Sequence, residues 1–274
     1  MRFQNPIAVM FAGALAAACT SAPLGELQDA KPKGSDVSQA LAEEYRRFAA
    51  AEVTEMIDLK DGEYFVHKGL RAARGGEPAP ERVANWQLSE TDVSRLQAAR
   101  HRLAAALANR PEAAAPRTAA YAQVGFDCWI EQQEEAFQPQ DIDGCRSAFI
   151  ANVDALERRA DYPHSVFFAL DAAALTPDAK RRIGWLAARA LRLDVPRVTV
   201  LGHADTTGGT KHNLKLSLKR ADAVERALIA AGLPADRVGV AAAGEKRPRV
   251  ATGDGVAEAQ NRRVEVLFQP AVGW

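Results

Sequence analysis

The chain has 274 residues, and its 47% hydrophobic content is enough for one large or two ordinary domains with apolar cores. Its 35 basic and 35 acidic residues balance, which argues against nucleic acid as a partner. The balance is uneven along the chain, because residues 166–274 hold 17 Lys and Arg against 11 Asp and Glu, while residues 1–165 hold 18 against 24. This asymmetry indicates two units, of which the basic C-terminal one suits an anionic polymer.

The N-terminus has the pattern of a signal peptide. Arg2 supplies a positive charge, and an apolar stretch over residues 7–18 follows it and ends at Cys19. A stretch of this length is too short to span a bilayer permanently, so we expect residues 1–18 to be removed on export. An ordinary secretory cleavage site with an incidental cysteine is the alternative interpretation.

The sequence Leu-Ala-Ala-Ala-Cys at the end of this stretch resembles the lipobox of bacterial lipoproteins. The resemblance implies that Cys19 is lipidated and becomes the mature N-terminus. Thr20 stands where enterobacterial inner-membrane lipoproteins carry Asp, which implies sorting to the outer membrane. Acyl chains bury many methylene groups, so such an anchor would hold the protein firmly on the membrane.

Residues 19–36 hold four Pro and Gly residues among small and polar ones, a composition that predicts a lipidated tether without a fold. Residues 37–162 are rich in Ala, Leu, Glu and Arg, and apolar residues recur there at helical spacing. Ser89 is a candidate helix N-cap, and Pro111 and Pro139 mark helix ends. We therefore predict a small helical domain over residues 37–162, with helices at 37–58, 63–74, 89–109, 118–137 and 141–159.

Two cysteines remain once Cys19 is assigned to the lipid, and these are Cys128 and Cys145. In an exported protein such a pair usually forms a disulfide, which we predict here. A metal site is the alternative, but the sequence has no Cys-x-x-Cys motif and no nearby His to complete a ligand set. We therefore expect no metal.

A Glu-rich segment follows Cys128, with acidic residues at Glu131, Glu134 and Glu135. We interpret it as a solvated helix face. The alternative is a set of general acids, which would make this segment part of an enzyme.

Residues 163–274 alternate short apolar strands with helical patterns. Thr176-Pro177-Asp178 is a strong helix start, because a capping hydroxyl is followed by Pro in the first turn and by an acidic side chain at the positive end of the helix dipole. Alternating elements predict a two-layer α/β sandwich with a βαβαββ mixed sheet, so the whole chain is of the α+β class. Strands are expected at 166–170, 197–201, 237–241 and 263–269.

The candidate ligand-binding residues lie between Val198 and Leu228, where a strand, a Gly-rich turn and a helix follow one another. Asp205 lies in the turn, while Asn213, Ser217 and Arg220 share one helix face at i, i+4 and i+7. A carboxylate and a guanidinium beside one cleft would select a ligand that carries both an ammonium and a carboxylate. The core-facing stripe of this helix is predicted to be Leu214, Leu218, Ala221, Val224 and Leu228.

Four segments in this order, GHAD, NLKLSLKRADAV, GEKRP and NRRVEV, resemble the peptidoglycan-binding domain of the OmpA and Pal families. The resemblance covers residues 165–269. It implies that Asp205 pairs with the ammonium of diaminopimelate in the peptidoglycan stem peptide and that Arg220 takes its carboxylate. Around this pair it implies a pocket completed by Asn213, Asn261 and Arg263.

Two features of the pocket stay open at the level of sequence. Side chains alternate along a strand, so only one of Arg262 and Arg263 should face the cleft, and the family motif favours Arg263. Ala169 and Ala204 stand where the family commonly has Asp and Thr, so secondary contacts of the pocket are reduced.

The resemblance implies a lipoprotein on the periplasmic face of the outer membrane of a Gram-negative bacterium, which binds peptidoglycan noncovalently and links membrane to wall. We expect no enzyme activity and no cofactor, and a helical domain that presents a surface to an envelope protein. The alternative is a hydrolase acting on peptidoglycan, using residues 131–135 or the pair His203 and Asp205.

Overall fold

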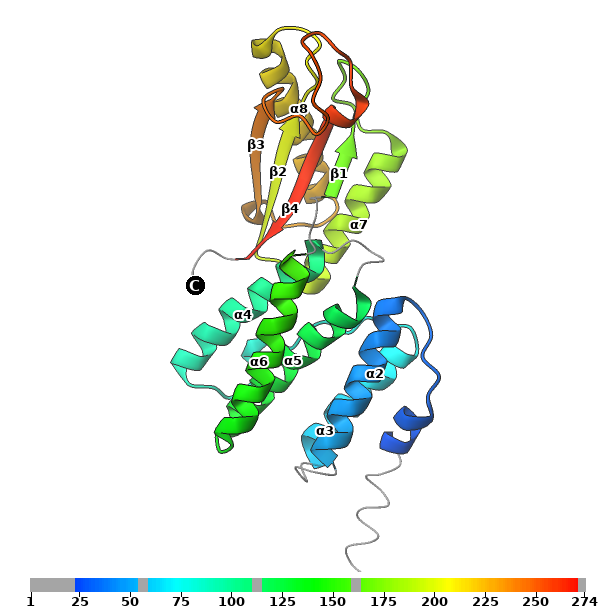
Figure 1. Ribbon diagram of the computed structural model, residues 1–274, viewed down its shortest axis with the longest axis vertical. Helices are drawn as coiled ribbons and strands as arrows, with labels where there is room; N and C mark the ends of the chain where they lie inside the picture. The colour runs from blue at the N-terminus through cyan, green and yellow to red at the C-terminus, as the bar shows by residue number, and fades with distance from the viewer. Residues whose placement is uncertain (1–22, 54–58, 110–114, 159–163, 271–274) are drawn as a thin grey trace, which may run out of the picture. The chain divides into compact units, whose positions relative to one another are not determined.

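The computed structural model describes residues 23–53, 59–109, 115–158 and 164–270 (Figure 1). The expected signal peptide, residues 1–18, and Cys19 lie outside the described residues. The chain divides into two compact units, one made of residues up to 78 with 115–152, and one made of 79–114 with 153 onward. The predicted α+β class is confirmed, because helices precede a four-stranded mixed sheet.

The first unit is helical, as predicted. It contains α2 (Asp36–Ala51), α3 (Leu59–Ala73), α5 (Pro116–Glu135) and most of α6 (Pro139–Arg158). Ser35 caps α2 by accepting a hydrogen bond from the Ser38 backbone N–H at 3.1 Å. Helix α2 packs against both α3 and α5.

A buried polar network joins these three helices. Tyr45 on α2 donates its hydroxyl to Asp127 Oδ2 on α5 at 2.5 Å, and Lys68 Nζ on α3 lies 2.5 Å from the same oxygen. Gln123 Nε2 donates to the Tyr45 hydroxyl at 3.0 Å. Since Asp127 is fully buried, its charge requires both partners, and the network therefore specifies how the helices pack.

The expected tether has structure from residue 23 onward, which corrects the prediction for residues 19–36. Residues 23–29 are helical, and Leu24 and Leu27 are 6% and 0% exposed. Arg46 holds this segment by donating to the carbonyls of Leu27 and Ala30 at 2.9 and 2.8 Å. The two leucines one helical turn apart outweigh the effect of nearby Pro and Gly, because they have an apolar surface to cover.

Glu131 corrects a second prediction, that of a solvated acidic face. It is fully buried on α5, where Gln132 Nε2 donates to its Oε2 at 2.9 Å. Burial, together with the neighbouring Glu52 carboxylate, raises the pKa of Glu131 to about 9. The run of glutamates in residues 131–135 did not show that the turn of α5 carrying Glu131 faces the core.

The predicted disulfide is confirmed. Cys128 on α5 is bonded to Cys145 on α6, with their Cα atoms 5.6 Å apart and a sequence separation of 17 residues. Beside it, Phe126 packs edge-on against Phe149 on the same two helices. The covalent and apolar contacts together hold α5 and α6 side by side.

The second unit contains the mixed sheet. Its elements run β1 (His164–Phe167), α7 (Pro177–Leu193), β2 (Arg197–His203), α8 (Thr210–Ala230), β3 (Val238–Gly244) and β4 (Arg263–Gln269), with short 3-10 helices η2 (Val83–Asn85), η3 (Ala235–Arg237) and η4 (Ala259–Asn261). The strand order is β1-β4-β2-β3; β2 and β3 are parallel, and β4 is antiparallel to both its neighbours. The predicted βαβαββ topology is thus confirmed.

One face of this sheet carries the apolar core. Val198 and Val200 of β2 and Val264 and Val266 of β4 are fully buried, and the residues between them are more exposed. This alternation follows from the two-residue period of a strand. The predicted start of α7 is also present, since Thr176 Oγ1 accepts from the Ala179 N–H at 3.1 Å.

Helix α4 (Glu90–Asn109) belongs to the second unit, although it lies within the range 37–162 that we predicted as a helical domain. The Asn109 side chain donates to the Phe268 carbonyl at 2.6 Å and accepts from the Phe268 N–H at 3.0 Å. Arg189 on α7 donates to the carbonyls of Leu107 and Ala108 at the end of α4. Helix α4 therefore belongs to the sheet domain, because its C-terminal end is bonded to both β4 and α7.

Candidate functional site

The site is built where four segments meet at the ends of β1, β2 and β4 and the first half of α8. Gly202 on β2 allows this approach, because a Cβ at this position would lie 1.9 Å from the Ser217 carbonyl of α8. Only glycine permits this helix to lie so close to the strand. The first half of α8 is thereby held against the loop that carries Asp205.

Arg220 is fully buried and anchors two of the segments. Its Nε donates to the Ala172 carbonyl at 2.8 Å, its Nη1 to the His203 carbonyl at 3.1 Å and its Nη2 to the Ala169 carbonyl at 3.0 Å. Its guanidinium also lies 5.4 Å from the centre of the Phe168 ring. Burial lowers the pKa of Arg220, and the nearby Asp205 carboxylate opposes this shift.

Asp205 is 4% exposed and is already paired. Arg262 Nη1 lies 2.9 Å from Asp205 Oδ2, and the backbone N–H of Glu258 donates to the same oxygen at 3.2 Å. The Thr207 N–H donates to Asp205 Oδ1 at 3.4 Å. Arg262 also donates from Nε to the Phe168 carbonyl at 3.2 Å, so Arg262 and Arg220 both bond to the segment that follows β1.

The two adjacent arginines take different positions, as strand alternation predicts. Arg262 lies beside Asp205, whereas Arg263, which the family motif favoured, contacts other groups. Its Nε donates to Glu265 Oε1 at 2.8 Å, and its Nη2 donates to the Arg247 carbonyl at 3.4 Å. The structure therefore brings Arg262, which we had not assigned, to the Asp205 and Arg220 pair, and it does not bring Arg263 there.

Arg263 instead belongs to a cluster with Glu265 and His203. His203 Nε2 lies 3.4 Å from Glu265 Oε2, and His203 is 1% exposed. The contact with His203, followed by the hydrogen bond from Arg263, lowers the pKa of Glu265 to about 2 against the opposing effect of burial. This cluster lies next to the site, where β2 ends and β4 begins.

The two asparagines that the resemblance assigned to the pocket are both buried. Asn213 Nδ2 donates to Glu245 Oε2 at 2.6 Å. In Asn261, both polar atoms of the side chain bond to the backbone of one loop. Asn261 Oδ1 accepts from the N–H groups of Arg249 and Val250, and its Nδ2 donates to the Val250 carbonyl. Asn261 therefore holds the loop before β4, and Asn213 holds Glu245 at the end of β3.

The core-facing stripe predicted for α8 is wrong in its first half. Leu214 and Leu218 are 49% and 45% exposed, whereas the polar Asn213, Ser217 and Arg220 are buried. The physical reason is that this half of α8 covers loops, whose backbone groups require hydrogen-bonding partners. The second half covers the sheet, and there Ala221, Val224 and Leu228 are buried as predicted.

Two further observations concern the described part of the chain. Within it, no group of three or more His, Cys, Asp or Glu side chains gathers closely enough to hold a metal ion. None of its helices is long and apolar enough to cross a membrane.

Comparison with known proteins places this site in a family context. Residues 167–262 match the model of the OmpA family. The chain is 34% identical over 108 residues to the probable lipoprotein YiaD of Escherichia coli, which covers 39% of this chain and 49% of that protein. It is 38% identical over 101 residues to the peptidoglycan-associated lipoprotein of Pseudomonas aeruginosa, covering 36% of this chain and 59% of the relative.

Among solved structures, the peptidoglycan-associated lipoprotein from Burkholderia pseudomallei is similar over 38% of this chain and 89% of its own, with 28% identity and a TM-score of 0.36. The match to the family model falls in the C-terminal part of the chain. The chain spans about half the length of the curated relatives it matches.

Proposed function

We propose, starting from the OmpA-family domain in the C-terminal part of this chain, that the protein binds peptidoglycan noncovalently through the diaminopimelate of the stem peptide. In this role it links the outer membrane to the cell wall and has no catalytic activity. The observation that carries the proposal is the convergence of Asp205, Arg220 and Arg262 at one end of the sheet. A relative named peptidoglycan-associated lipoprotein supports the same polymer as ligand.

The chemistry of the site suits the free end of diaminopimelate, which carries an ammonium and a carboxylate on one carbon. Asp205 accepts hydrogen bonds from the ammonium, and an arginine fork matches the carboxylate. Arg262 has a side chain that is 14% exposed, whereas Arg220 is fully buried, so Arg262 is the guanidinium that the ligand meets first. The zwitterion enters the Asp205 and Arg262 ion pair and satisfies both charges.

The remaining residues support this ion pair by positioning the loops around it. Arg220 holds the loops after β1 and β2 through three backbone carbonyls, which positions Asp205. Asn213 and Asn261 fix the loops after β3 and before β4. Arg263 contributes through its contact with Glu265, which lies two residues further along β4.

Attachment to the membrane rests on Cys19. Lipidation there would place the described chain on the periplasmic face of the outer membrane, and a relative named as a probable lipoprotein supports this arrangement. The helical unit then presents a surface for an envelope protein. The hydrolase alternative gains no support, because Glu131 is buried and Asp205 is already paired with Arg262.

The test compares two muropeptides that differ by one carboxylate. The purified full-length protein should bind a diaminopimelate-containing muropeptide about tenfold or more tightly than one with lysine in its place, because lysine leaves the guanidinium without its charged acceptor. Calorimetry measures both affinities, and co-sedimentation with sacculi measures binding to the intact polymer. Equal affinity for the two muropeptides would contradict the proposal.

A further inference from the structure

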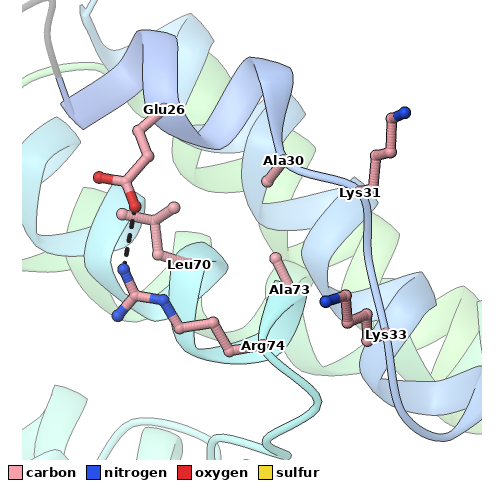
Figure 2. A pocket seen from close by; sticks show the side chains of 7 residues that line it. All are labelled: Glu26, Ala30, Lys31, Lys33, Leu70, Ala73 and Arg74. Carbon is pink, nitrogen blue, oxygen red and sulfur yellow. Dashed lines mark hydrogen bonds and ion pairs between the residues drawn. The ribbon is translucent and has the colours of Figure 1, made fainter.

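A pocket of about 430 Å³ opens in the first unit, between residues 26–33 and the end of α3 (Figure 2). Its floor is apolar, with Leu70 and Ala73 each 5% exposed and Ala30 beside them. Lys33 and Arg74 extend along the two sides of this floor, and Lys31 extends outward at the rim. The pocket thus combines an apolar floor with a cationic rim.

The walls of the pocket are held in place before any ligand arrives. Leu27 is fully buried against Gly69, where an added Cβ would lie 2.8 Å from a leucine methyl group. Arg46 donates to the Leu27 and Ala30 carbonyls, and the Lys33 N–H donates to the Ala73 carbonyl at 3.0 Å. A cavity built in this way does not need to order its walls on binding, which favours affinity.

The charges of the rim favour an anion. Glu26 lies 2.9 Å from Arg74, so these two charges offset each other. In the described part of the chain no carboxylate lies within 4.0 Å of Lys31 or Lys33, and the rim keeps two positive charges. Ammonium groups above an apolar floor suit a ligand with an anionic head and an apolar body, since lysine stems also cover apolar surface.

The location along the chain points to a membrane as the source of that ligand. Pro23 follows Cys19 by four residues, and Glu26 follows by seven. An extended residue spans at most about 3.6 Å and a helical one about 1.5 Å, so Glu26 lies within roughly 20 Å of Cys19. With a lipid on Cys19, the pocket is held near the head groups of the same membrane. This step rests on the lipid anchor of the proposed function.

We propose that this pocket binds the phosphate head group of an anionic phospholipid in the membrane that holds Cys19. The phosphate lies against Lys33, Lys31 at the rim adds a second positive charge that attracts it, and the glycerol end of the lipid contacts Leu70 and Ala73. Binding orients the first unit on the membrane surface, which a lipid on Cys19 alone would not do.

The experiment uses the full chain, produced and processed in a Gram-negative host and reconstituted into vesicles of phosphatidylcholine with phosphatidylglycerol. A photocrosslinking amino acid replaces Ala30, and mass spectrometry detects the lipid adduct. We expect an adduct with phosphatidylglycerol that falls about tenfold or more in the double variant Lys31→Ala, Lys33→Ala. The matched double variant Lys180→Ala, Lys215→Ala removes the same charge from exposed positions of the second unit and should leave the adduct unchanged.

Three results would overturn the proposal. They are an equal adduct in phosphatidylcholine vesicles, an adduct unaffected by loss of Lys31 and Lys33, and complete competition by inorganic phosphate, which would assign the pocket to a free anion. Protein that does not float with the vesicles would refute both the lipid anchor and this inference. Sacculus binding by the same preparation reports separately on the wall-binding part of the proposed function.

Discussion

At the residue scale, the ion pair between Asp205 and Arg262 is the feature on which wall binding depends. Both side chains are largely buried, so a change that removes one charge leaves the other without compensation. The ligand offers one charge to each partner. Single substitutions at these positions therefore have larger effects on binding than their small exposed areas suggest.

Asp205→Asn should weaken binding of a diaminopimelate muropeptide by about thirtyfold or more, since truncating one partner of a buried charge pair costs about 2 kcal/mol or more. Calorimetry measures the affinity, and thermal unfolding establishes that the variant is folded. Asp254→Asn is the control, because Asp254 is exposed in the loop before β4. Affinity within about twofold of wild type would rule out Asp205 as the ammonium partner.

The two arginines before and in β4 can be separated by matched substitutions to Lys, which keep the charge and remove the planar fork. Arg262→Lys should lower muropeptide affinity about tenfold, because one lysine cannot reach both Asp205 and the Phe168 carbonyl. Arg263→Lys should stay within about twofold of wild type. The opposite order in a binding titration would restore Arg263 as the ligand contact.

At the element scale, Glu131 couples the stability of α5 to pH. Its folded pKa of about 9 lies above the value in an unfolded chain, so the folded state holds the extra proton and stability is greatest at low pH. Stability then falls as pH rises from about 4.5 to 9. This is the reverse of the usual behaviour of a salt-bridged carboxylate.

Glu131→Gln should remove this dependence, since glutamine keeps the shape and cannot ionise. Between pH 6 and pH 8 the wild type should lose about 2 kcal/mol of unfolding free energy that the variant retains. Urea titrations at both pH values measure the difference. Glu43→Gln on the exposed side of α2 is the control, and a parallel response of the two variants would contradict the assignment.

The attachment of α4 to β4 gives a second test at this scale. Asn109→Ala should destabilise the second unit by about 2 kcal/mol, because it leaves the N–H and C=O of Phe268 without their partners. Hydrogen exchange of the Phe268 amide should accelerate correspondingly. Asn152→Ala is the control, since Asn152 donates only within its own helix; unchanged exchange at Phe268 would show that α4 is not an integral part of the unit.

At the scale of the whole molecule, the proposed function requires two attachments at separate parts of the chain. Cys19→Ser should release the protein from the outer-membrane fraction while binding to sacculi persists. Asp205→Asn should weaken binding to sacculi while the protein stays in the outer-membrane fraction. Fractionation and sacculus co-sedimentation of the same cells measure both properties, and loss of both in either single variant would show that membrane and wall binding are not independent.

Most secondary structure was predictable from sequence because its causes are local. The Thr176 cap and the alternating valines of β2 and β4 each act within a few residues of their own position. The pairing of Cys128 with Cys145 followed from the count of cysteines in an exported chain. The presence of Asp205 and Arg220 near one another followed from motifs on adjacent elements.

Only the tertiary structure decided which arginine meets Asp205, which half of α8 buries polar groups, and that Glu131 is inside. Each depends on what packs against the residue from a distant part of the chain. Strand alternation says that Arg262 and Arg263 point apart, but the turn at η4 sets which of them faces the loops. The same holds for α4, whose sequence marks a helix, while its docking depends on Phe268, which lies 159 residues away from Asn109.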